Sequence, residues 1–412
     1  MKKVLSVICL LLLCLELFFI EKLRMETPAI TASRITQQQS VEEAAPTPEA
    51  APAAAIDPAA TAAPAPEATP EPTPEPTPEP QKEFVITLLG DYTLWSNPNY
   101  AEHPAGFKGV MAGDYAYPSH NTLALYADDE FTISNCECTL SDKNLPYDYT
   151  QVYFPFLAPT EYAEVFNAAG IDFVTTANNH MMDCYQAGAD STWAALEEHG
   201  VPFGREGEAK IVETPHGLKI GVYCSGQDLA PNKNKAVAAV EQLRADGAEY
   251  IICALHWGQE LYSTPNKSQT DLAHACIDAG ADLIYGSHTH CLQPIEEYNG
   301  GLVLYSCGNW IFGGNTMPSD PDTALFQVTL ERQEDGSLVR KGSVNVIPCC
   351  VSSKLGEAKT KAQNYNDYCP TPYETDSAEF NRVFSKLSGE YEPSSQGADY
   401  TDWLLSRGGG SE

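Results

Sequence analysis

Two histidines one residue apart stand directly after an apolar run. Gly286-Ser287-His288-Thr289-His290 follows residues 281–285, Ala-Asp-Leu-Ile-Tyr. Such a pair, mounted at the end of a buried strand, offers two imidazole ligands to Zn, Mn, Fe, Co or Ni. Small residues before the pair let the backbone come close to a bound group. A His-x-His pattern alone also fits a surface loop that happens to contain two histidines.

Metal-type side chains follow four further apolar runs. In chain order these are Asp91 after Gly90, Asn135 with Glu137, Asn178-Asn179-His180, and His256-Trp257-Gly258-Gln259-Glu260. Taken singly, each is also what a turn or a solvated loop would contain. Functional groups of α/β sheets collect beyond the carboxyl ends of the strands. Because five strand ends each carry such residues, we expect one shared site.

The chemistry of these residue types is coherent. A carboxylate able to bridge (Glu137 or Asp91), the amide oxygen of Asn179 and several imidazoles describe a mixed oxygen and nitrogen site for one or two divalent ions. His180, next to Asn179, is placed to protonate a leaving group rather than to bind metal. Cysteines at these ends only flank the candidate ligands, at 136, 138 and 291, which argues against a structural thiolate zinc site.

The elements that must position these residues alternate along the chain. We expect strands at 84–89, 131–134, 171–176, 210–214, 218–224, 250–255, 282–285, 295–298, 302–306, 324–332 and 338–346, and helices at 160–169, 190–199, 235–245 and 268–279. This alternation predicts an α/β domain over residues 84–348, with late hairpins adding antiparallel strands. Beyond Pro348 the sequence predicts an irregular polar tail, 349–412, with one helix near 377–387.

The first 83 residues do not look globular. Lys2 and Lys3 precede an apolar run from Val4 to Ile20, and no clear small-x-small cleavage site follows at once. We therefore expect residues 1–24 to be an uncleaved signal-anchor rather than a cleaved signal peptide. The charges predict a cytoplasmic N-terminus and an exported C-terminal domain, hence a single-pass protein of the cell membrane. Residues 25–83, rich in Ala, Pro, Glu and Thr, predict an extended linker.

Charge and cysteine content limit the partners. The chain has a net charge of -32, and residues 84–412 alone hold 18 Lys plus Arg against 44 Asp plus Glu. This acidity argues against nucleic acid as a partner. Eleven of the 13 cysteines lie after residue 84, an odd number that cannot pair completely within the domain. Cys224 and Cys253, inside apolar runs, predict buried free thiols, whereas Cys349, Cys350 and Cys369 are candidates for pairing.

Six motifs in order carry a family likeness. They are Gly90-Asp91, Asn135-Cys136-Glu137, Ala177-Asn178-Asn179-His180, His256-Trp257-Gly258-Gln259-Glu260, Gly286-Ser287-His288-Thr289-His290 and Ser306-Cys307-Gly308-Asn309-Trp310. Over residues 84–315 the chain resembles the CapA family of bacterial capsule and poly-γ-glutamate synthesis proteins. That family is itself similar to the calcineurin-like metallophosphoesterases.

The resemblance implies a four-layer α/β/β/α sandwich and one or two divalent ions, Mn, Zn or Fe. It implies metal ligation by Asp91, Glu137, Asn179, His256, His288 and His290, an acid role for His180, and supporting roles for Asn135, Asn178, Glu260 and Asn309. The chain departs from the metallophosphoesterase pattern where that pattern has Asp-x-His, because Asp91 is followed by Tyr92-Thr93. The bridging Asp of that superfamily corresponds here to Glu137. Cys307 and Trp310 replace an expected Leu and Phe.

Three functions remain open at this point. The resemblance implies a cell-surface factor for synthesis, export or anchoring of an anionic polymer, with the membrane and other polymer-synthesis membrane proteins as partners. The predicted ligand set favours a metal-dependent phosphoesterase or related hydrolase acting on an envelope substrate. A non-catalytic envelope scaffolding module that has kept the fold is the third.

Overall fold

The computed structural model describes residues 82–96, 102–148, 155–314, 318, 320–354 and 366–391. The chain divides into two units, Met1–Gln81 and Lys82–Glu412, and the described residues belong to the second. The predicted signal-anchor, and the predicted linker up to residue 81, therefore lie outside the described residues. Within the described part of the chain, no helix is both long enough and apolar enough to cross a membrane.

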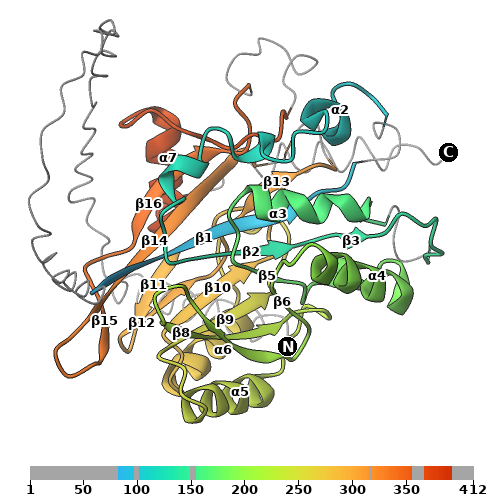
Figure 1. Cartoon of the computed structure of the whole chain (residues 1–412). Helices are drawn as coiled ribbons and strands as arrows, with labels where there is room; N and C mark the ends of the chain where they lie inside the picture. The colour runs from blue at the N-terminus through green and yellow to red at the C-terminus, as the bar shows by residue number, and fades with distance from the viewer. Residues whose placement is uncertain are drawn as a thin grey trace, which may run out of the picture. The chain divides into compact units, whose positions relative to one another are not determined.

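The first of two large sheets contains nine strands, which come from the beginning and the end of the domain sequence (Figure 1). Its centre is β1 (Glu83–Thr93), which pairs in parallel with β2 (Phe131–Cys136) and with the short β13 (Asn309–Phe312), and antiparallel with β14 (Asp322–Arg332). The remaining strands are β5 (Phe173–Thr175), β6 (Phe203–Gly204), β15 (Leu338–Arg340), β16 (Asn345–Cys350) and β17 (Thr371–Pro372).

The second sheet contains six strands in the order β11-β12-β10-β9-β8-β7. β8 (Lys219–Ser225), β9 (Tyr250–His256), β10 (Leu283–Ser287) and β12 (Gly301–Leu304) are parallel, whereas β7 (Ala209–Glu213) and β11 (Ile295–Tyr298) are antiparallel additions at the two edges. β3 (Thr139–Leu140) and β4 (Leu157–Ala158) form a separate small pair. Both large sheets thus present carboxyl ends of parallel strands, where functional side chains collect.

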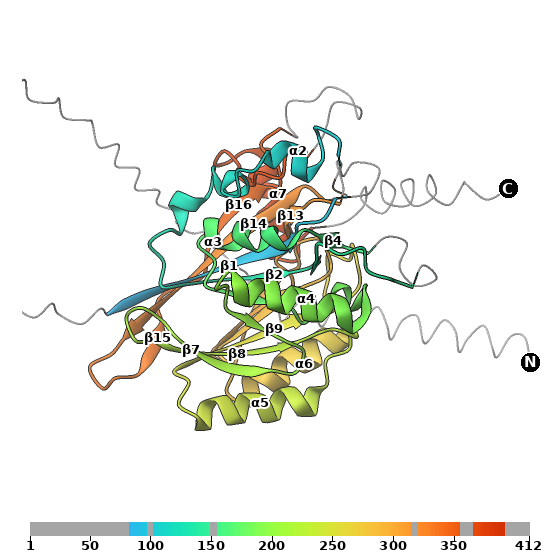
Figure 2. The same ribbon diagram turned by 45° about the vertical axis from the view of Figure 1, so that its right-hand side comes forward.

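The two sheets pack face to face, with helices on both outer sides (Figure 2). Apolar side chains from both, including Ile86, Phe131 and Ile252, form one core between them. The Tyr285 hydroxyl of β10 also donates to the Leu89 carbonyl of β1 at 2.7 Å. A second core lies under α2 (Phe107–Met111), α3 (Glu164–Ala168) and α4 (Tyr185–Glu198), and a third under α5 (Lys233–Ala245) and α6 (Lys267–Asp278). Helix, sheet, sheet and helix therefore form successive layers.

Local sequence explains where these elements begin and end. β9 is apolar as far as Leu255 and buried throughout, as expected of a central parallel strand covered on both faces. The side chain of Asn266 caps α6 by accepting from the Gln269 amide, and Gln269 answers in a capping box. The glycine that follows α6, Gly280, has a φ of 110°, a conformation that other residues seldom adopt.

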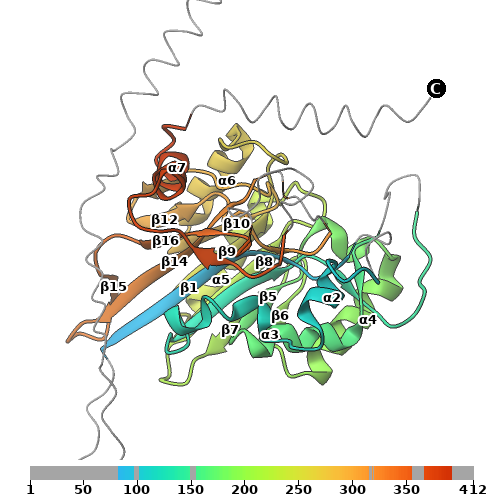
Figure 3. The same cartoon turned by 90° about the horizontal axis from the view of Figure 1, so that it is seen from above.

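The structure confirms the predicted mixed α/β domain and corrects several details. The helix expected at 160–169 is a 3₁₀ turn, η3 (Thr160–Ala163), followed by α3, and the strand expected at 338–346 divides into β15 and β16. The other 3₁₀ turns are η1 (Tyr117–Ser119), η2 (Leu123–Leu125) and η4 (Asn179–Met182). The helix expected near 377–387 is confirmed as α7 (Ala378–Leu387), which packs on the first sheet, but the described part of the tail is less irregular than expected, because β16 continues to Cys350 and β17 pairs with it. Figure 3 shows α7 beside β16.

Candidate metal centre

The predicted ligands converge where strand ends of the two sheets meet. Asp91 lies in β1, Glu137 follows β2 and Asn179 opens η4 on the first side. From the second sheet, His256 ends β9, while His288 and His290 follow β10. His256 Nε2 lies 2.8 Å from Asn179 Oδ1 and 3.3 Å from Glu137 Oε1, and the His288 backbone amide donates to Asp91 Oδ2 at 3.2 Å. The predicted convergence is therefore observed for all six residues.

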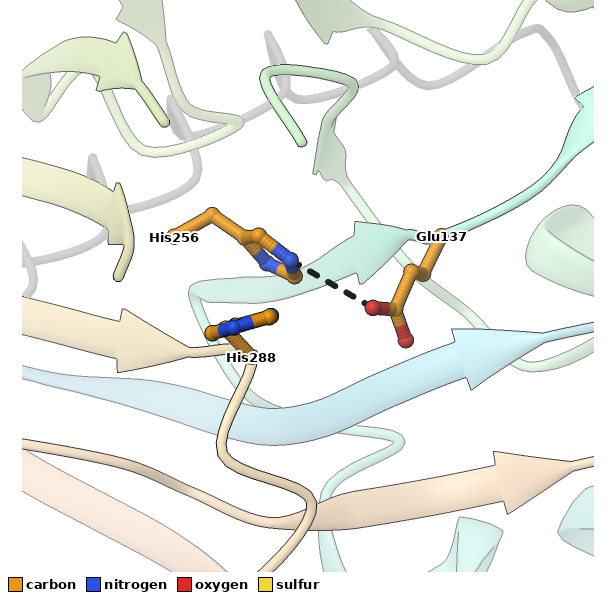
Figure 4. Close-up of side chains that lie close together, drawn as sticks. All are labelled: Glu137, His256 and His288. Carbon is orange, nitrogen blue, oxygen red and sulfur yellow. Dashed lines mark ion pairs between the residues drawn. The ribbon is translucent and has the colours of Figure 1, made fainter. Parts of the chain in front are cut away.

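Two groups of ligand-type atoms overlap at Glu137. One comprises Glu137, His256 and His288, and the other Asp91, Glu137 and His290, with the atoms of each group within 4.8 Å of one another. Figure 4 shows the first group, in which His256 and Glu137 form an ion pair and the His288 ring lies beside them. Glu137 is thus the residue common to both groups.

The donor atoms fit a cation because two of them are buried without a hydrogen bond. Glu137 Oε1 and His288 Nδ1 are buried without a hydrogen-bond partner. Buried polar atoms are nearly always hydrogen-bonded, because leaving one unpaired costs about 1–3 kcal/mol. A carboxylate oxygen and an imidazole nitrogen that lack hydrogen bonds, within one compact group, match the ligand preferences of Mn, Fe and Zn.

Neighbouring side chains fix how the ligands point. Ser287 Oγ lies 2.9 Å from His256 Nδ1, which leaves Nε2 facing the cluster. Asn309 Oδ1 lies 2.9 Å from His290 Nδ1 and fixes that ring in the same way. The Asn135 amide donates to Asp91 Oδ1 at 2.8 Å, and the Thr93 hydroxyl donates to Glu137 Oε2 at 3.0 Å. Partners of this kind set ring tautomer and ligand basicity at metal centres.

Burial and mutual charge shift the pKa values of the cluster in opposite directions. Burial, with repulsion from Glu137, raises the pKa of Asp91 to about 6. Burial also opposes ionisation of Glu137, but His290 and His256 outweigh it and lower the pKa of Glu137. Burial disfavours the His290 cation, yet Glu137 and Asp91 raise its pKa. Burial and repulsion from His256 lower the pKa of His288 to about 2, so its ring is neutral at physiological pH.

His180 lies beside the cluster and is held by Asp183 and Phe156, which together we call the His180 clamp. Its Nδ1 lies 2.9 Å from Asp183 Oδ2, and the same oxygen accepts the Phe156 backbone amide at 2.8 Å. The ring stacks on Phe156 with centroids 3.7 Å apart, and Phe156 stacks on Trp95 in turn. Burial opposes the His180 cation, but the hydrogen bond to Asp183 raises its pKa. The arrangement fixes a proton-bearing imidazole through one nitrogen and the face of its ring.

The supporting residues fall into two groups. Asn135, Asn178 and Asn309 belong to the network, with Asn178 donating to Asn135 Oδ1 at 3.0 Å and to the Cys136 carbonyl at 2.8 Å. Glu260 is exposed and contributes only its charge, which helps to raise the pKa of His290.

Sequence reasoning missed Thr93, Asp183, Phe156 and the role of Ser287. Spacing could have found two of them. Thr93 lies two residues after Asp91 on the same strand, and Asp183 lies three residues after His180. Phe156 gave no such signal, because its stacking partners are distant in sequence.

Two features of the backbone hold the ligand loops close together. His288 and His290 have φ values of 94° and 54°, in the left-handed region that residues with side chains rarely occupy. Such strain concentrates at functional sites, where surrounding contacts enforce it. Gly90 lets the Asp91 amide reach the Gly308 carbonyl at 2.9 Å, since a β-carbon there would lie 2.3 Å from that oxygen.

Fold and site together define a two-sheet α/β protein with a carboxylate, amide and imidazole cluster at the rim shared by its sheets. Residues 85–314 match the family described as bacterial capsule synthesis protein PGA_cap, and the chain belongs to this family.

Similar proteins include the PGA biosynthesis protein CapA of Bacillus subtilis strain 168, 30% identical over 197 residues that make up 43% of this chain and 51% of that protein. The capsule biosynthesis protein CapA of Bacillus anthracis is 26% identical over 232 residues, 51% of this chain and 55% of the relative. The chain therefore spans about half the length of the curated relatives it matches.

Solved structures resemble the chain only distantly. TT1561 of Thermus thermophilus is 11% identical with a TM-score of 0.34, covering 63% of this chain and 98% of that one. Vps29 of Chaetomium thermophilum is 10% identical with a TM-score of 0.23, covering 72% and 99%. At these scores the architecture rests on the topology described above.

Proposed function

We propose that this protein acts at the outer face of a bacterial membrane in the synthesis, export or anchoring of an anionic capsule polymer of the poly-γ-glutamate type, and that it uses a divalent metal site to do so. Family membership supports the polymer pathway. The signal-anchor expected over residues 1–24 supports the location, with other polymer-synthesis membrane proteins as partners.

A single observation supports the metal site most strongly: two ligand groups share Glu137, and the buried Glu137 Oε1 and His288 Nδ1 have no hydrogen-bond partner. Asp91, Glu137, Asn179, His256, His288 and His290 would hold one or two ions, with Mn, Zn or Fe suited to the donors. Two carboxylates face the rings, and a bound cation offsets that charge.

The acidity of the domain gives the site a role in polymer binding. Residues 84–412 carry 18 basic and 44 acidic side chains, so a polyglutamate chain is repelled by most of the surface. A divalent ion at the rim supplies positive charge at the place where the polymer would have to be received. Metal loading and polymer handling are therefore linked in this proposal.

Metal analysis of the full chain tests the site directly. We expect the purified wild-type chain, exposed to Mn²⁺ or Zn²⁺ and then dialysed, to retain metal, and His288→Ala to retain less. His274→Ala is the matched control, because that histidine bonds Glu296 away from the cluster. Equal, negligible retention in all three would refute the metal site. Unchanged surface polymer after deletion of the gene would refute the role in capsule synthesis.

A metal-dependent phosphoesterase or related hydrolase of envelope substrates is the second candidate. The clamp on His180 favours it, because a proton-bearing ring fixed by Asp183 beside ligand Asn179 is suited to protonate a leaving group. Metal, when bound, supplies Lewis acidity and an activated nucleophile. His180 would give its proton to the departing oxygen, while Asn309 and Ser287 keep the neighbouring rings in place. A metal-loaded chain that cleaves neither phosphoesters nor amides would rule it out.

If the chain proves not to be a hydrolase, experiments in cells still show whether the site is required for the surface polymer. If His180→Ala and His290→Ala both support normal surface polymer in cells, the protein acts as a non-catalytic scaffold. If either variant abolishes the polymer while remaining folded, the site itself is required.

A further inference from the structure

A buried ionic cluster joins the C-terminal helix to the strand that starts beside the site. Lys386 of α7 is completely buried, and its Nζ donates to Asp320 at 2.7 and 2.8 Å and to Asp322 at 2.7 Å. Asp322 is the first residue of β14, which pairs antiparallel with β1 as far as Leu88 and Phe326, so the start of β14 points toward the end of β1 that carries Asp91. Lys386 lies outside the family-matched range 85–314.

The cluster is balanced in charge and has good geometry. Asp322 also accepts two hydrogen bonds from Arg382, both at 2.7 Å, and one from the Tyr373 hydroxyl at 2.9 Å. Two carboxylates thus face two cations. A buried pair of this kind adds little net stability compared with apolar packing, but removing one partner leaves an uncompensated charge and is strongly destabilising. The cluster therefore holds α7 and the start of β14 in one relative arrangement.

The segments that the cluster joins lie close to the His290 loop. A β-carbon on Gly308 would lie 3.5 Å from the carbonyl carbon of Cys291, the residue directly after His290, and 3.6 Å from the Asp322 carbonyl oxygen, so this glycine lies close to both segments. Leu292 forms a bridge with Cys307, and the Thr323 hydroxyl, one residue after Asp322, lies 3.4 Å from the Cys307 carbonyl.

The end of α7 approaches the same loop. A β-carbon on Gly389, just past the helix, would lie 3.4 Å from Pro294. Both segments that the ionic cluster joins, α7 and the start of β14, therefore approach the stretch from His290 to Pro294.

The loop from His288 to Pro294 needs support because its backbone is strained. Left-handed φ angles at His288 and His290 persist only when surrounding contacts enforce them. The front of the loop is held by Asp91 and Asn309, through the His288 amide and the His290 ring. The end of α7 approaches the same loop at Pro294, and the start of β14 approaches it next to Cys291.

We propose that Lys386 is a positioning residue for His290: by bridging Asp320 and Asp322 it locks the C-terminal helix beneath the loop and holds the imidazole in its ligand orientation. This proposal concerns the same site as the proposed metal function, and its metal-affinity test rests on that function. The C-terminal segment is accordingly part of the site rather than an appendage to the family domain.

Histidine-selective NMR of the full chain, which has nine histidines, tests the proposal without metal. We expect Lys386→Met to shift or broaden the His290 ring signals and to leave those of His199 and His274 unchanged. Arg332→Met is the matched control, because Arg332 pairs with Glu249 at the opposite end of the same strand. It should lower the melting temperature without moving His290. A His290 signal identical in wild type and Lys386→Met would overturn the proposal.

A second variant separates positioning from stability. Asp320→Asn combined with Lys386→Met removes one charge of each sign and leaves Asp322 with Arg382, so the melting temperature should recover while the His290 shift remains. Return of the His290 signal to its wild-type position would show that charge balance, and not the bridge, matters. This variant also decides the question if Lys386→Met alone does not fold.

Metal titration adds the functional arm. Loss of a residue that orients a ligand typically weakens metal affinity 10–100-fold, and we expect that range for the double variant. An affinity unchanged from wild type would contradict the proposal. If the wild type binds no divalent ion, the proposed metal function fails, and the His290 ring signals still decide whether Lys386 positions that residue.

Discussion

Glu137 is the residue on which the site converges, because both ligand groups contain it and neither can form without it. Glu137→Gln keeps the size of the side chain but removes the charge that His256 and His290 face. We expect this variant to lose metal at both positions, whereas His290→Ala loses only the position shared with Asp91. Metal per chain, measured after dialysis, distinguishes the two. Equal losses would show that the groups do not share one carboxylate.

Asp183 determines how His180 presents its proton. Asp183→Asn is isosteric but removes the charge that raises the pKa of His180. If the hydrolase candidate holds, we expect turnover of substrates with poor leaving groups to fall about 10²–10⁴-fold, the usual contribution of a positioned acid or base. Metal content should not change, since Asp183 belongs to neither ligand group. Unchanged turnover, or a parallel loss of metal, would contradict this role.

At the scale of elements, close approach of β1 and the turn before β13 holds Asp91 in the site. Gly90→Ala would put a β-carbon 2.3 Å from the Gly308 carbonyl, which accepts the Asp91 amide. We expect a loss of about 1–3 kcal/mol in the free energy of unfolding, with reduced metal content, measured by denaturant titration and metal analysis. Gly113→Asn is the control, because Gly113 has open space and a φ that asparagine tolerates. Equal effects would argue against the close approach.

Sequence predicted these elements well where local signals are strong. Apolar runs ending in Asp91, His256 and His288 identified the central strands, and placing their carboxyl ends at one rim followed from parallel topology. The boundaries were less accurate, because the turns at 160–163 and near Gly342 depend on packing. In the described part of the C-terminal segment the helix was predicted but its burial was not: Lys386 is buried where Asp320 and Asp322, distant in sequence, pair with it.

At the scale of the whole molecule, stability depends on pH through partly buried carboxyls such as Asp129. Burial raises its pKa to about 7, with Asp128 and Asp172 adding to the effect. Since the folded-state pKa lies above the unfolded value of about 3.9, this stability is present below pH 4 and is lost as pH rises through 7. Asp129→Asn should therefore stabilise the fold at pH 8, on the order of 1 kcal/mol after allowance for solvent, and little at pH 4.

Thermal melts across this range check the prediction. Asp128→Asn, an exposed neighbour, is the control and should change stability by less than about 0.5 kcal/mol at either pH. If both variants behave alike, general charge repulsion and not the burial of Asp129 sets the pH dependence.

The eleven cysteines of the described residues are all free and all buried, so the predicted buried thiols at Cys224 and Cys253 are confirmed and the described Cys349, Cys350 and Cys369 are unpaired. We expect the native chain to react slowly with a thiol reagent at these eleven positions and quickly in denaturant. Counting labelled cysteines by peptide mass spectrometry measures both. Rapid native labelling at any of the eleven would contradict their burial.

Because these thiols are free, we expect heat denaturation in air to be irreversible. Once the chain unfolds in air, its exposed thiols oxidise to disulfides in random pairings, and each non-native disulfide prevents refolding. Cooling should then restore the protein only when a reductant is present, so its lifetime outside a reducing medium is governed by how rarely it opens and not by how favourably it closes.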